Sequence, residues 1–445
     1  MTQKAAPNTN VTPLMKQYYE VKNKYPDIIV FFRLGDFYEM FEDDAKKASQ
    51  ILSITLTKRN GIPMCGVPHH SAGNYMSKLL KSGNKIGVCE QLEEPSKGTK
   101  IVKRGVVRVM SPGTVVEENM LDEKNNNYIL GLFPDLDTNE LGLTIIDIST
   151  GDFLGALFDN LNDIDSIISE IKKYSPTEII LPAEFDNLPL INTIKKNISA
   201  ISTSLDNNYS DANLLNENLV NKVVKKNITS KTLFNASINM LNYVTRNYKS
   251  ASEHLKQIKI YNPNHFMLMN ENTIRHLELV ENYYTRKRKH SLLDCIDTTL
   301  TPMGSRKIKD WLLKPLLDSK KIKIRQKIVK FFVENNSIRE SIRENLKNIR
   351  DIDRLISRIS CNANTPRDIV GLKMSLEILP KICESLQSSN EIIKVFFMSS
   401  IIFKSICLNG NFTNTDGDLW SAYSTSASAN AVSHDLHQYT GFCPR

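Results

Sequence analysis

The clearest pattern of hydrophobic and polar positions lies between residues 28 and 41. Residues 28–32 are all β-branched or aromatic, which is typical of a strand. Gly35 and Asp36 then predict a tight turn, because glycine accepts a positive φ and aspartate bonds to its own backbone. After the turn the side chains alternate with period two, so Phe37 and Glu39 face the same way. We therefore expect a β-hairpin that presents an aromatic ring and a carboxylate side by side near its turn.

The position of Glu39 has two interpretations. A strand buried in a core would not place this carboxylate between Phe37 and Phe41 on one face without a partner for its charge. An isolated Phe-x-Glu is most often part of an edge strand with a solvated glutamate. The hairpin pattern alone leaves both a structural and a functional interpretation open.

Residues 1–120 predict one mixed α/β domain. Helices are expected over residues 43–52, directly after the hairpin, and over residues 72–82. Lys58 and Arg59 lie at a strand end beside a loop. They are either solvated charges of a loop or contacts to the phosphates of a nucleic-acid duplex, which would hold the duplex in position without recognising its base sequence.

Residues 121–265 predict a second α/β domain. It begins with a polar linker over residues 122–127, after which apolar strands alternate with a helix. The expected strands cover residues 141–148, 153–157 and 178–181, and the expected helix covers residues 164–174.

Residues 266–408 predict an all-α part. Threonine followed by proline marks helix starts at Thr301 and Thr365, because threonine caps the first turn and proline fits its first position. A third helix is expected to begin at Asp318, and residues 273–284 also have helical character.

Charge and composition narrow the class of protein. The net charge of +8 is uneven, with +5 in residues 1–120, −5 in 121–265, +10 in 266–408 and −2 in 409–445. This distribution favours contact with nucleic acid through certain domains only, and the alternative for each segment is a solvated charged face. There is no apolar signal region and no apolar run of membrane-spanning length, so we expect a cytoplasmic protein without membrane contact.

The seven cysteines include no Cys-x-x-Cys pair, and His69-His70 has no second cluster of metal-binding residues, so we expect reduced thiols and no metal site.

Several motifs, taken in their order and spacing, resemble the bacterial MutS family of DNA mismatch-recognition proteins. Besides the hairpin at residues 33–41, they are residues 12–18, 43–45, 56–59, 62–68, 89–91 and 109–114. In that family the phenylalanine of the Phe-x-Glu motif wedges into the base stack, and the glutamate hydrogen-bonds a mispaired base. The resemblance implies these roles for Phe37 and Glu39.

The same resemblance implies a DNA-binding surface and a set of partners. The residues expected to bind DNA are Phe37, Glu39, Lys58, Arg59, Met64 and Arg108. The expected ligand is double-stranded DNA that contains a mismatch. Family members form dimers and recruit a MutL-type partner, and the bacterial nucleoid is the expected location.

For residues 121–265 the resemblance implies the family's connector domain, which has a ribonuclease-H-like fold. That fold raises an alternative, since Asp147 and Asp152 could hold Mg²⁺ for phosphodiester hydrolysis. A two-metal nuclease needs further carboxylates that converge on one place, and the sequence identifies no such set. Residues 301–306 and 351–355 resemble the family's helical lever domain, which residues 266–408 are expected to form in part.

The family's clamp and ATPase domains are not visible in this sequence. It contains no Gly-x-x-x-x-Gly-Lys-Ser/Thr loop and no Gly-Lys dipeptide. We therefore expect no enzyme activity and no cofactor in this chain, although the full-length family uses ATP and Mg²⁺. The alternative function is a truncated interaction module that keeps the fold but binds little DNA.

The composition changes near the end of the chain. Lys404 is the last lysine, and residues 420–430 are small and polar. We expect the family resemblance to end near residue 400, after a frameshift or premature end, and residues 409–445 to form an aberrant, disordered tail.

Overall fold

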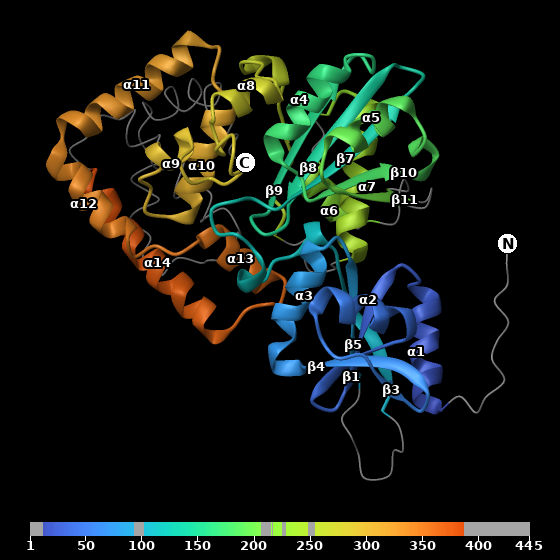
Figure 1. Ribbon diagram of the computed structural model, residues 1–445. Helices are drawn as coiled ribbons and strands as arrows, with labels where there is room; N and C mark the ends of the chain where they lie inside the picture. The colour runs from blue at the N-terminus through green and yellow to red at the C-terminus, as the bar shows by residue number, and fades with distance from the viewer. Residues whose placement is uncertain are drawn as a thin grey trace. The chain divides into compact units, whose positions relative to one another are not determined.

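The computed structural model describes residues 12–92, 102–205, 215, 217–224, 228–247 and 254–386. The chain divides into two compact units (Figure 1). The first comprises Met1–Leu121 and Tyr243–Lys249, and the second comprises Asp122–Asn242 and Ser250–Arg445.

The first unit contains a six-stranded sheet with the order β3-β4-β2-β1-β5-β6. Only β1 and β5 are parallel; the other neighbours are antiparallel. The strands are β1 (Ile28–Leu34), β2 (Phe37–Phe41), β3 (Thr57–Arg59), β4 (Ile62–Pro68), β5 (Lys85–Gln91) and β6 (Arg104–Met110).

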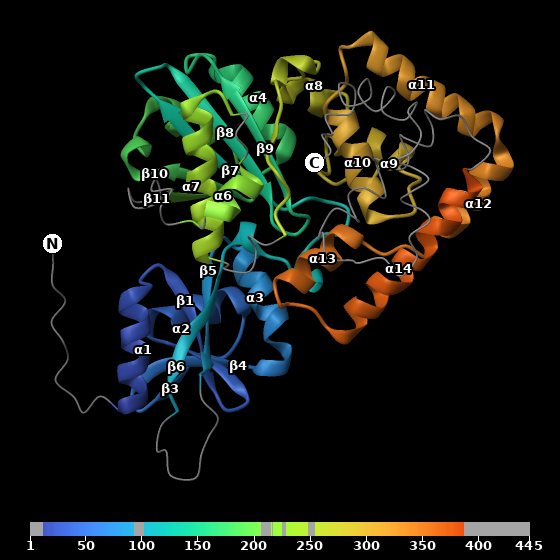
Figure 2. The ribbon, with the colours of Figure 1, turned by 180° about the vertical axis from the view of Figure 1, so that it is seen from behind.

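Helices cover both faces of this sheet (Figures 1 and 2). Helix α1 (Pro13–Lys24) packs Met15 and Tyr18 on one face, against alternate residues of β1 such as Phe32. Helices α2 (Glu42–Leu52) and α3 (Ala72–Lys81) pack on the other face, against Ile29 and Phe31. Because β1 is buried on both sides, it is apolar without interruption from residue 28 to residue 32.

The predicted hairpin is confirmed. Leu34 pairs with Phe37 and Phe32 pairs with Glu39, so β1 and β2 are joined by two residues. Gly35 has a φ of +56°, which is the left-handed conformation that the turn requires. The helices expected over residues 43–52 and 72–82 are also present, within one residue at each end, as α2 and α3.

The second unit contains another six-stranded sheet, with the order β11-β10-β7-β8-β9-β12. Strands β7, β8 and β9 form an antiparallel meander, whereas β10 runs parallel to β7 and to β11. The strands are β7 (Tyr128–Asp135), β8 (Glu140–Asp147), β9 (Asp152–Phe158), β10 (Glu178–Pro182), β11 (Ile201–Leu205) and β12 (Lys259–Ile260).

Helices α4 (Ile164–Tyr174) and α5 (Pro189–Asn197) bury Ile171 and Ile191 against one face of this sheet. Helix α7 (Lys231–Asn247) lies on the other face (Figure 2), and the short helix α6 (Glu217–Val223) precedes it. Gly142 permits a close approach of α7, because a Cβ there would lie 2.9 Å from that of Ala236. The predicted strands and the predicted helix over residues 164–174 are confirmed.

The remaining described part of the second unit is helical. Its helices are α8 (Glu271–His276), α9 (Leu292–Ile296), α10 (Pro302–Leu313), α11 (Ser319–Glu334), α12 (Asn336–Leu346), α13 (Ile352–Ser360) and α14 (Pro366–Ser385). The predicted starts at Thr301, Asp318 and Thr365 are confirmed. The side chains of Thr301 and Asp318 accept hydrogen bonds from the first turns of their helices, and Thr365 forms a capping box in which its backbone N–H and its hydroxyl donate to the Asp368 carboxylate. The prediction of helix throughout residues 273–284 is wrong, because α8 ends at His276 and Glu278 takes a positive φ of 47°.

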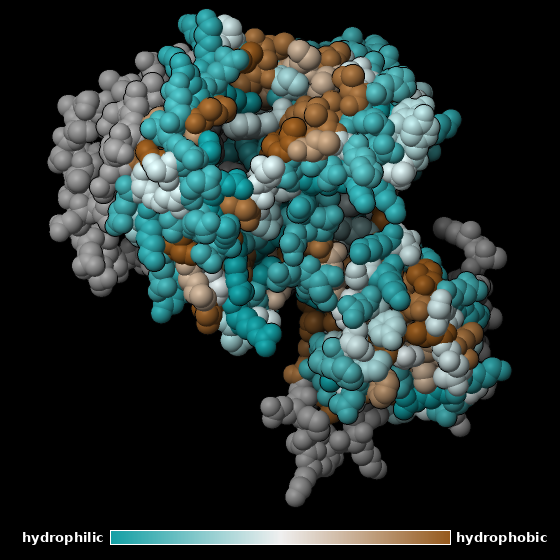
Figure 3. Space-filling model, turned by 60° about the vertical axis from the view of Figure 1, so that its left-hand side comes forward, coloured by the Kyte–Doolittle hydropathy of each residue, from teal (hydrophilic) through white to brown (hydrophobic). Residues whose placement is uncertain are grey.

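The combination of α/β and all-α parts agrees with the prediction. Among the described residues, no helix has both the length and the apolar character needed to cross a bilayer. The face in Figure 3 is mainly hydrophilic, with hydrophobic residues in separate patches. The five described cysteines are free thiols, and no three described His, Cys, Asp or Glu residues gather as a metal site.

Candidate nucleic-acid interface

Phe37 is an exposed aromatic residue on an otherwise well-packed strand. It is the first residue of β2 after the turn, and it is 47% exposed. Tyr38, Met40 and Phe41 on the same strand are buried. The hairpin is therefore anchored by its neighbours, while the Phe37 ring has contact with solvent and is accessible to a ligand.

Glu39 and Phe37 lie next to each other above a glycine. Glu39 pairs with Gly66 on β4, and a Cβ built on Gly66 would lie 3.6 Å from Cγ of Glu39 and 4.0 Å from Cδ1 of Phe37. The missing side chain thus leaves room for both neighbours on this face. The Glu39 side chain is only 13% exposed.

Arg59 supplies the partner for the Glu39 charge. Its Nη1 atom donates to both carboxylate oxygens of Glu39, at 2.7 Å and 2.5 Å. Arg59 ends β3 at the edge of the sheet, and its side chain is 45% exposed. Glu39 is therefore an ion-paired residue within the protein and not a freely solvated edge charge.

The other expected DNA-binding residues are distributed over both faces of the sheet. Met64 pairs with Phe41 and lies on the Glu39 face, where it is partly buried against the core next to α1. Lys58 is exposed on the other face of β3, because neighbours on a strand alternate. Arg108 pairs with Val88, which belongs to the core under α2 and α3, and it forms an ion pair with Glu117. The structure brings together Phe37, Glu39, Arg59 and Met64, but not Lys58 or Arg108.

The opposite face of the hairpin holds residues that the sequence analysis did not identify. The Tyr38 hydroxyl donates to Glu90 on β5, and the Arg33 guanidinium lies 5.5 Å from the Tyr38 ring centre. Burial, followed by the hydrogen bond to Glu90, raises the pKa of Tyr38 well above its ordinary value. The backbone N–H of His69 donates to the Asp36 carbonyl at 2.8 Å, which fixes the turn. These contacts fix the backbone from which Phe37 projects.

Comparison with known proteins identifies the family. Models of MutS domain I, MutS domain II and MutS domain III match residues 12–119, 127–259 and 272–434. The DNA mismatch repair protein MutS of Clostridioides difficile is 41% identical over 392 residues, which are 85% of this chain and 40% of that protein. The MutS protein of Caldanaerobacter subterraneus is 39% identical over 381 residues, or 84% of this chain and 44% of that protein. The chain belongs to the MutS family.

The chain spans less than half the length of these MutS relatives. The domain III match continues to residue 434, past residue 400, where we expected the resemblance to end. It thus includes much of the segment expected to be an unrelated tail, and residues 409–445 lie outside the described part of the structure.

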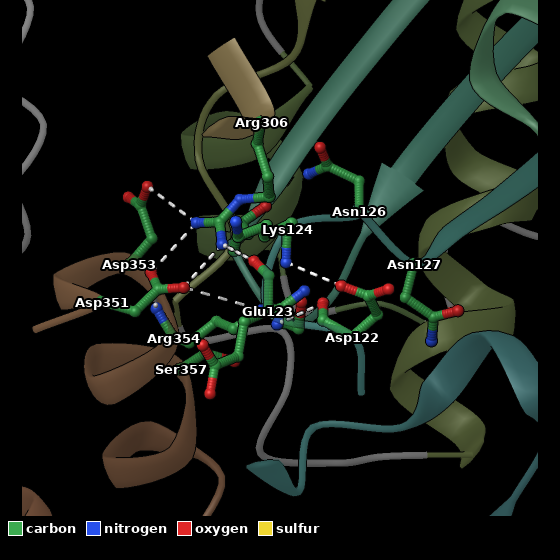
Figure 4. A network of polar contacts seen from close by, with 12 residues as sticks. Asp122, Glu123, Lys124, Asn126, Asn127, Arg306, Asp351, Asp353, Arg354 and Ser357 are labelled. Carbon is green, nitrogen blue, oxygen red and sulfur yellow. Dashed lines mark hydrogen bonds and ion pairs between the residues drawn. The ribbon is translucent and has the colours of Figure 1, made fainter. Parts of the chain in front are cut away.

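In the region between the parts matched to MutS domains I and II, residues 122–127 are not a free linker. Figure 4 shows arginines of the domain III part around this segment. Arg354 donates to the carbonyls of Asp122 and Asn125, at 2.8 Å and 2.6 Å. Arg306 donates to the Glu123 carbonyl at 3.0 Å. The segment is polar and contains no helix or strand, as predicted for a linker, but partners distant in sequence hold its backbone.

Arg306 also connects this segment to the start of α13. It forms hydrogen bonds with Asp351, which caps α13, and lies 4.0 Å from the Asp353 carboxylate (Figure 4). Burial alone would lower the pKa of Arg306, but the hydrogen bonds and charge of Asp351 outweigh it and raise the pKa.

The two carboxylates considered for Mg²⁺ already have other partners. Asp147 accepts from the backbone and hydroxyl of Ser149 and from the Asn126 amide. Asp152 accepts from Lys256 at 3.1 Å, and the same ammonium group donates to Asp353 at 3.0 Å. These contacts give both carboxylates structural roles and provide no support for the nuclease alternative.

Proposed function

We propose that this chain recognises mispaired or unpaired bases in duplex DNA and acts in DNA mismatch repair. Membership of the MutS family supports the general function. The observation that supports the mechanism is the exposed Phe37 ring beside Glu39, on a hairpin with a buried opposite face.

Phe37 would act as a wedge. An apolar side chain that enters a base step partly unstacks it and kinks the duplex, at a cost of about a few kcal/mol. A mispair has already lost some of its pairing and stacking, so it deforms at lower cost than a matched pair. Selectivity then arises from the deformability of the DNA, which suits a protein that must accept many different mispairs.

Glu39 would add discrimination at the kinked site. A carboxylate can accept a hydrogen bond from a base N–H, or donate one when it is protonated. In an unkinked duplex the same negative charge lies near phosphates and is repelled by them. Arg59 and Met64 would complete the contact surface on this face of the sheet, and Lys58 and Arg108 would contribute positive charge elsewhere.

The rest of the chain would support this domain. We propose that residues 121–265 form a ribonuclease-H-like connector, which the strand order β9-β8-β7-β10-β11 favours, and that residues 266–408 form part of a helical lever. Dimerisation, recruitment of a MutL-type partner and use of ATP and Mg²⁺ would belong to a longer family member. This chain, which lacks a phosphate-binding loop motif, would need no cofactor and catalyse no reaction.

Binding to duplexes with and without a G·T mispair tests the proposal. We expect the protein to favour the mispaired duplex, and Phe37→Ala to abolish that preference while leaving weak, salt-sensitive binding through phosphate contacts. Leu56→Ala is a matched control, because Leu56 is also apolar and is 45% exposed in the same unit. A Phe37→Ala protein with an unchanged preference for the mispair would remove Phe37 from the wedge role.

A further inference from the structure

The ion pair between Arg59 and Glu39 points to a role for Arg59 beyond neutralising the charge of Glu39. Glu39 is almost enclosed, whereas Arg59 lies at the sheet edge with nearly half of its side chain exposed. A single nitrogen, Nη1, makes both hydrogen bonds to the carboxylate. Within the part of the chain that the structure describes, Nε and Nη2 of Arg59 have no hydrogen-bond partner, so one edge of the guanidinium fork stays available.

The geometry makes it unfavourable to separate this pair when DNA binds. If Arg59 left Glu39 for a phosphate, a carboxylate that is 13% exposed would remain without a partner. Leaving one member of a desolvated charge pair unpaired is costly. The negative field of the duplex would add to that cost.

An arginine can bind the Glu39 carboxylate and a DNA phosphate at the same time. The guanidinium carries five N–H donors in a planar fork, so one nitrogen can hold a carboxylate while the others contact a phosphate. Lysine, with one compact ammonium group, does not offer this separation of donors. The position of Arg59 on β3, across β4 from Glu39 and open to solvent, fits such a bridge.

We propose that Arg59 is a positioning residue that bridges the Glu39 carboxylate and a phosphate of the bound duplex. The bridge orients the carboxylate toward the base that Phe37 displaces, and it offsets the repulsion between Glu39 and the DNA backbone. This inference rests on the proposed function, since it assigns a specificity-determining role within the same site. It makes the effect of Arg59 on binding dependent on the charge of Glu39.

A double-mutant cycle tests this dependence. The proteins are the parent chain, Arg59→Gln, Glu39→Gln and the double variant, each titrated with matched and G·T-mispaired duplex at two salt concentrations. We expect Arg59→Gln to weaken binding of the mispaired duplex about tenfold when Glu39 is present, and only about two- to threefold when residue 39 is neutral. The slope of the logarithm of the binding constant against the logarithm of the salt concentration should fall in magnitude by about one, with glutamate or with glutamine at position 39, because one phosphate contact is lost.

Lys58→Gln is the matched control. Lys58 is the preceding residue, it is exposed, and it faces away from Glu39, so its loss removes the same charge without touching the pair. Its effect should be the same with and without Glu39. Thermal melting of each variant checks folding, and Arg59→Lys replaces Arg59→Gln in the cycle if the latter fails to melt cooperatively.

The outcomes separate the two proposals. A preference of the parent chain for the mispair, together with a non-additive cycle, supports the bridge. The same preference with an additive cycle overturns the bridge and leaves the proposed function intact. A parent chain without any preference for the mispair overturns the proposed function and the bridge with it.

Discussion

Arg306 donates hydrogen bonds to both carboxylate oxygens of Asp351, at 2.5 Å and 2.9 Å, although the two residues are 45 positions apart. Both side chains are largely buried. The same guanidinium holds the Glu123 carbonyl, so one side chain joins α10, the start of α13 and the segment that precedes β7. A bidentate pair of this kind fixes geometry more strongly than a lysine could.

Loss of this pair should destabilise the second unit. We expect Arg306→Ala to lower its free energy of unfolding by about 3 kcal/mol, because Asp351 would remain buried without its main partner. Arg286→Ala is the control, since Arg286 and Glu281 form a more exposed pair at 3.2 Å, and it should cost less than about 1 kcal/mol. The measurement is urea unfolding followed by circular dichroism. Equal losses for the two variants would show that the buried pair has no special role.

Arg354 should protect residues 122–127 from cleavage by a protease. It donates to the Asp122 and Asn125 carbonyls, on either side of Lys124, whose side chain is exposed. Arg354→Ala should therefore increase tryptic cleavage after Lys124, because a released backbone fits a protease more readily.

The control for this experiment is Arg343→Ala. Arg343 also donates to a backbone carbonyl, that of Thr298, but through one hydrogen bond of 3.4 Å on an exposed surface. We expect this variant to be cleaved after Lys124 at the parental rate. Cleavage by trypsin that is just as slow in Arg354→Ala would mean that the segment is held without Arg354.

The features that the sequence predicts well are those with local causes. The starts of α10, α11 and α14 follow from capping residues within the first turn, and the hairpin follows from Gly35 and the alternation after it. The contacts of residues 122–127 were missed because their partners are up to 232 residues away, as for Arg354 and Asp122. No local pattern in a polar segment reveals such a partner.

The candidate site shows the same limit. The pattern places Phe37 and Glu39 on one face, and the strand register agrees. The pair between Glu39 and Arg59 depends on β3 and β2 lying on either side of β4, which is a property of sheet order and not of spacing. Arg108 likewise lies on the face of the sheet away from Glu39 because it pairs with Val88 on β5. The sequence of β6 has no alternating pattern that would show which of its faces is buried.

His254 should make the stability of the second unit depend on pH. Its Nε2 atom lies 2.7 Å from the Ile148 carbonyl, and Ser357 contacts both groups, at 3.0 Å and 2.8 Å. Burial is the main cause that lowers the pKa of His254 from 6.5 to about 4. Between these values the unfolded chain binds a proton that the folded protein excludes, so stability falls as the pH decreases from about 6.5 toward 4.

We expect this one group to remove about 2 kcal/mol of stability between pH 7 and pH 5. Urea unfolding of the parent chain and of His254→Gln at both pH values measures the effect. The glutamine variant should be less stable at pH 7, because it loses a fitted buried ring, but its stability should change less between the two pH values. His276→Gln is the control, because it makes the same substitution at an exposed histidine at the end of α8. An equal pH dependence in the parent chain and His254→Gln would show that His254 does not titrate on unfolding in this range.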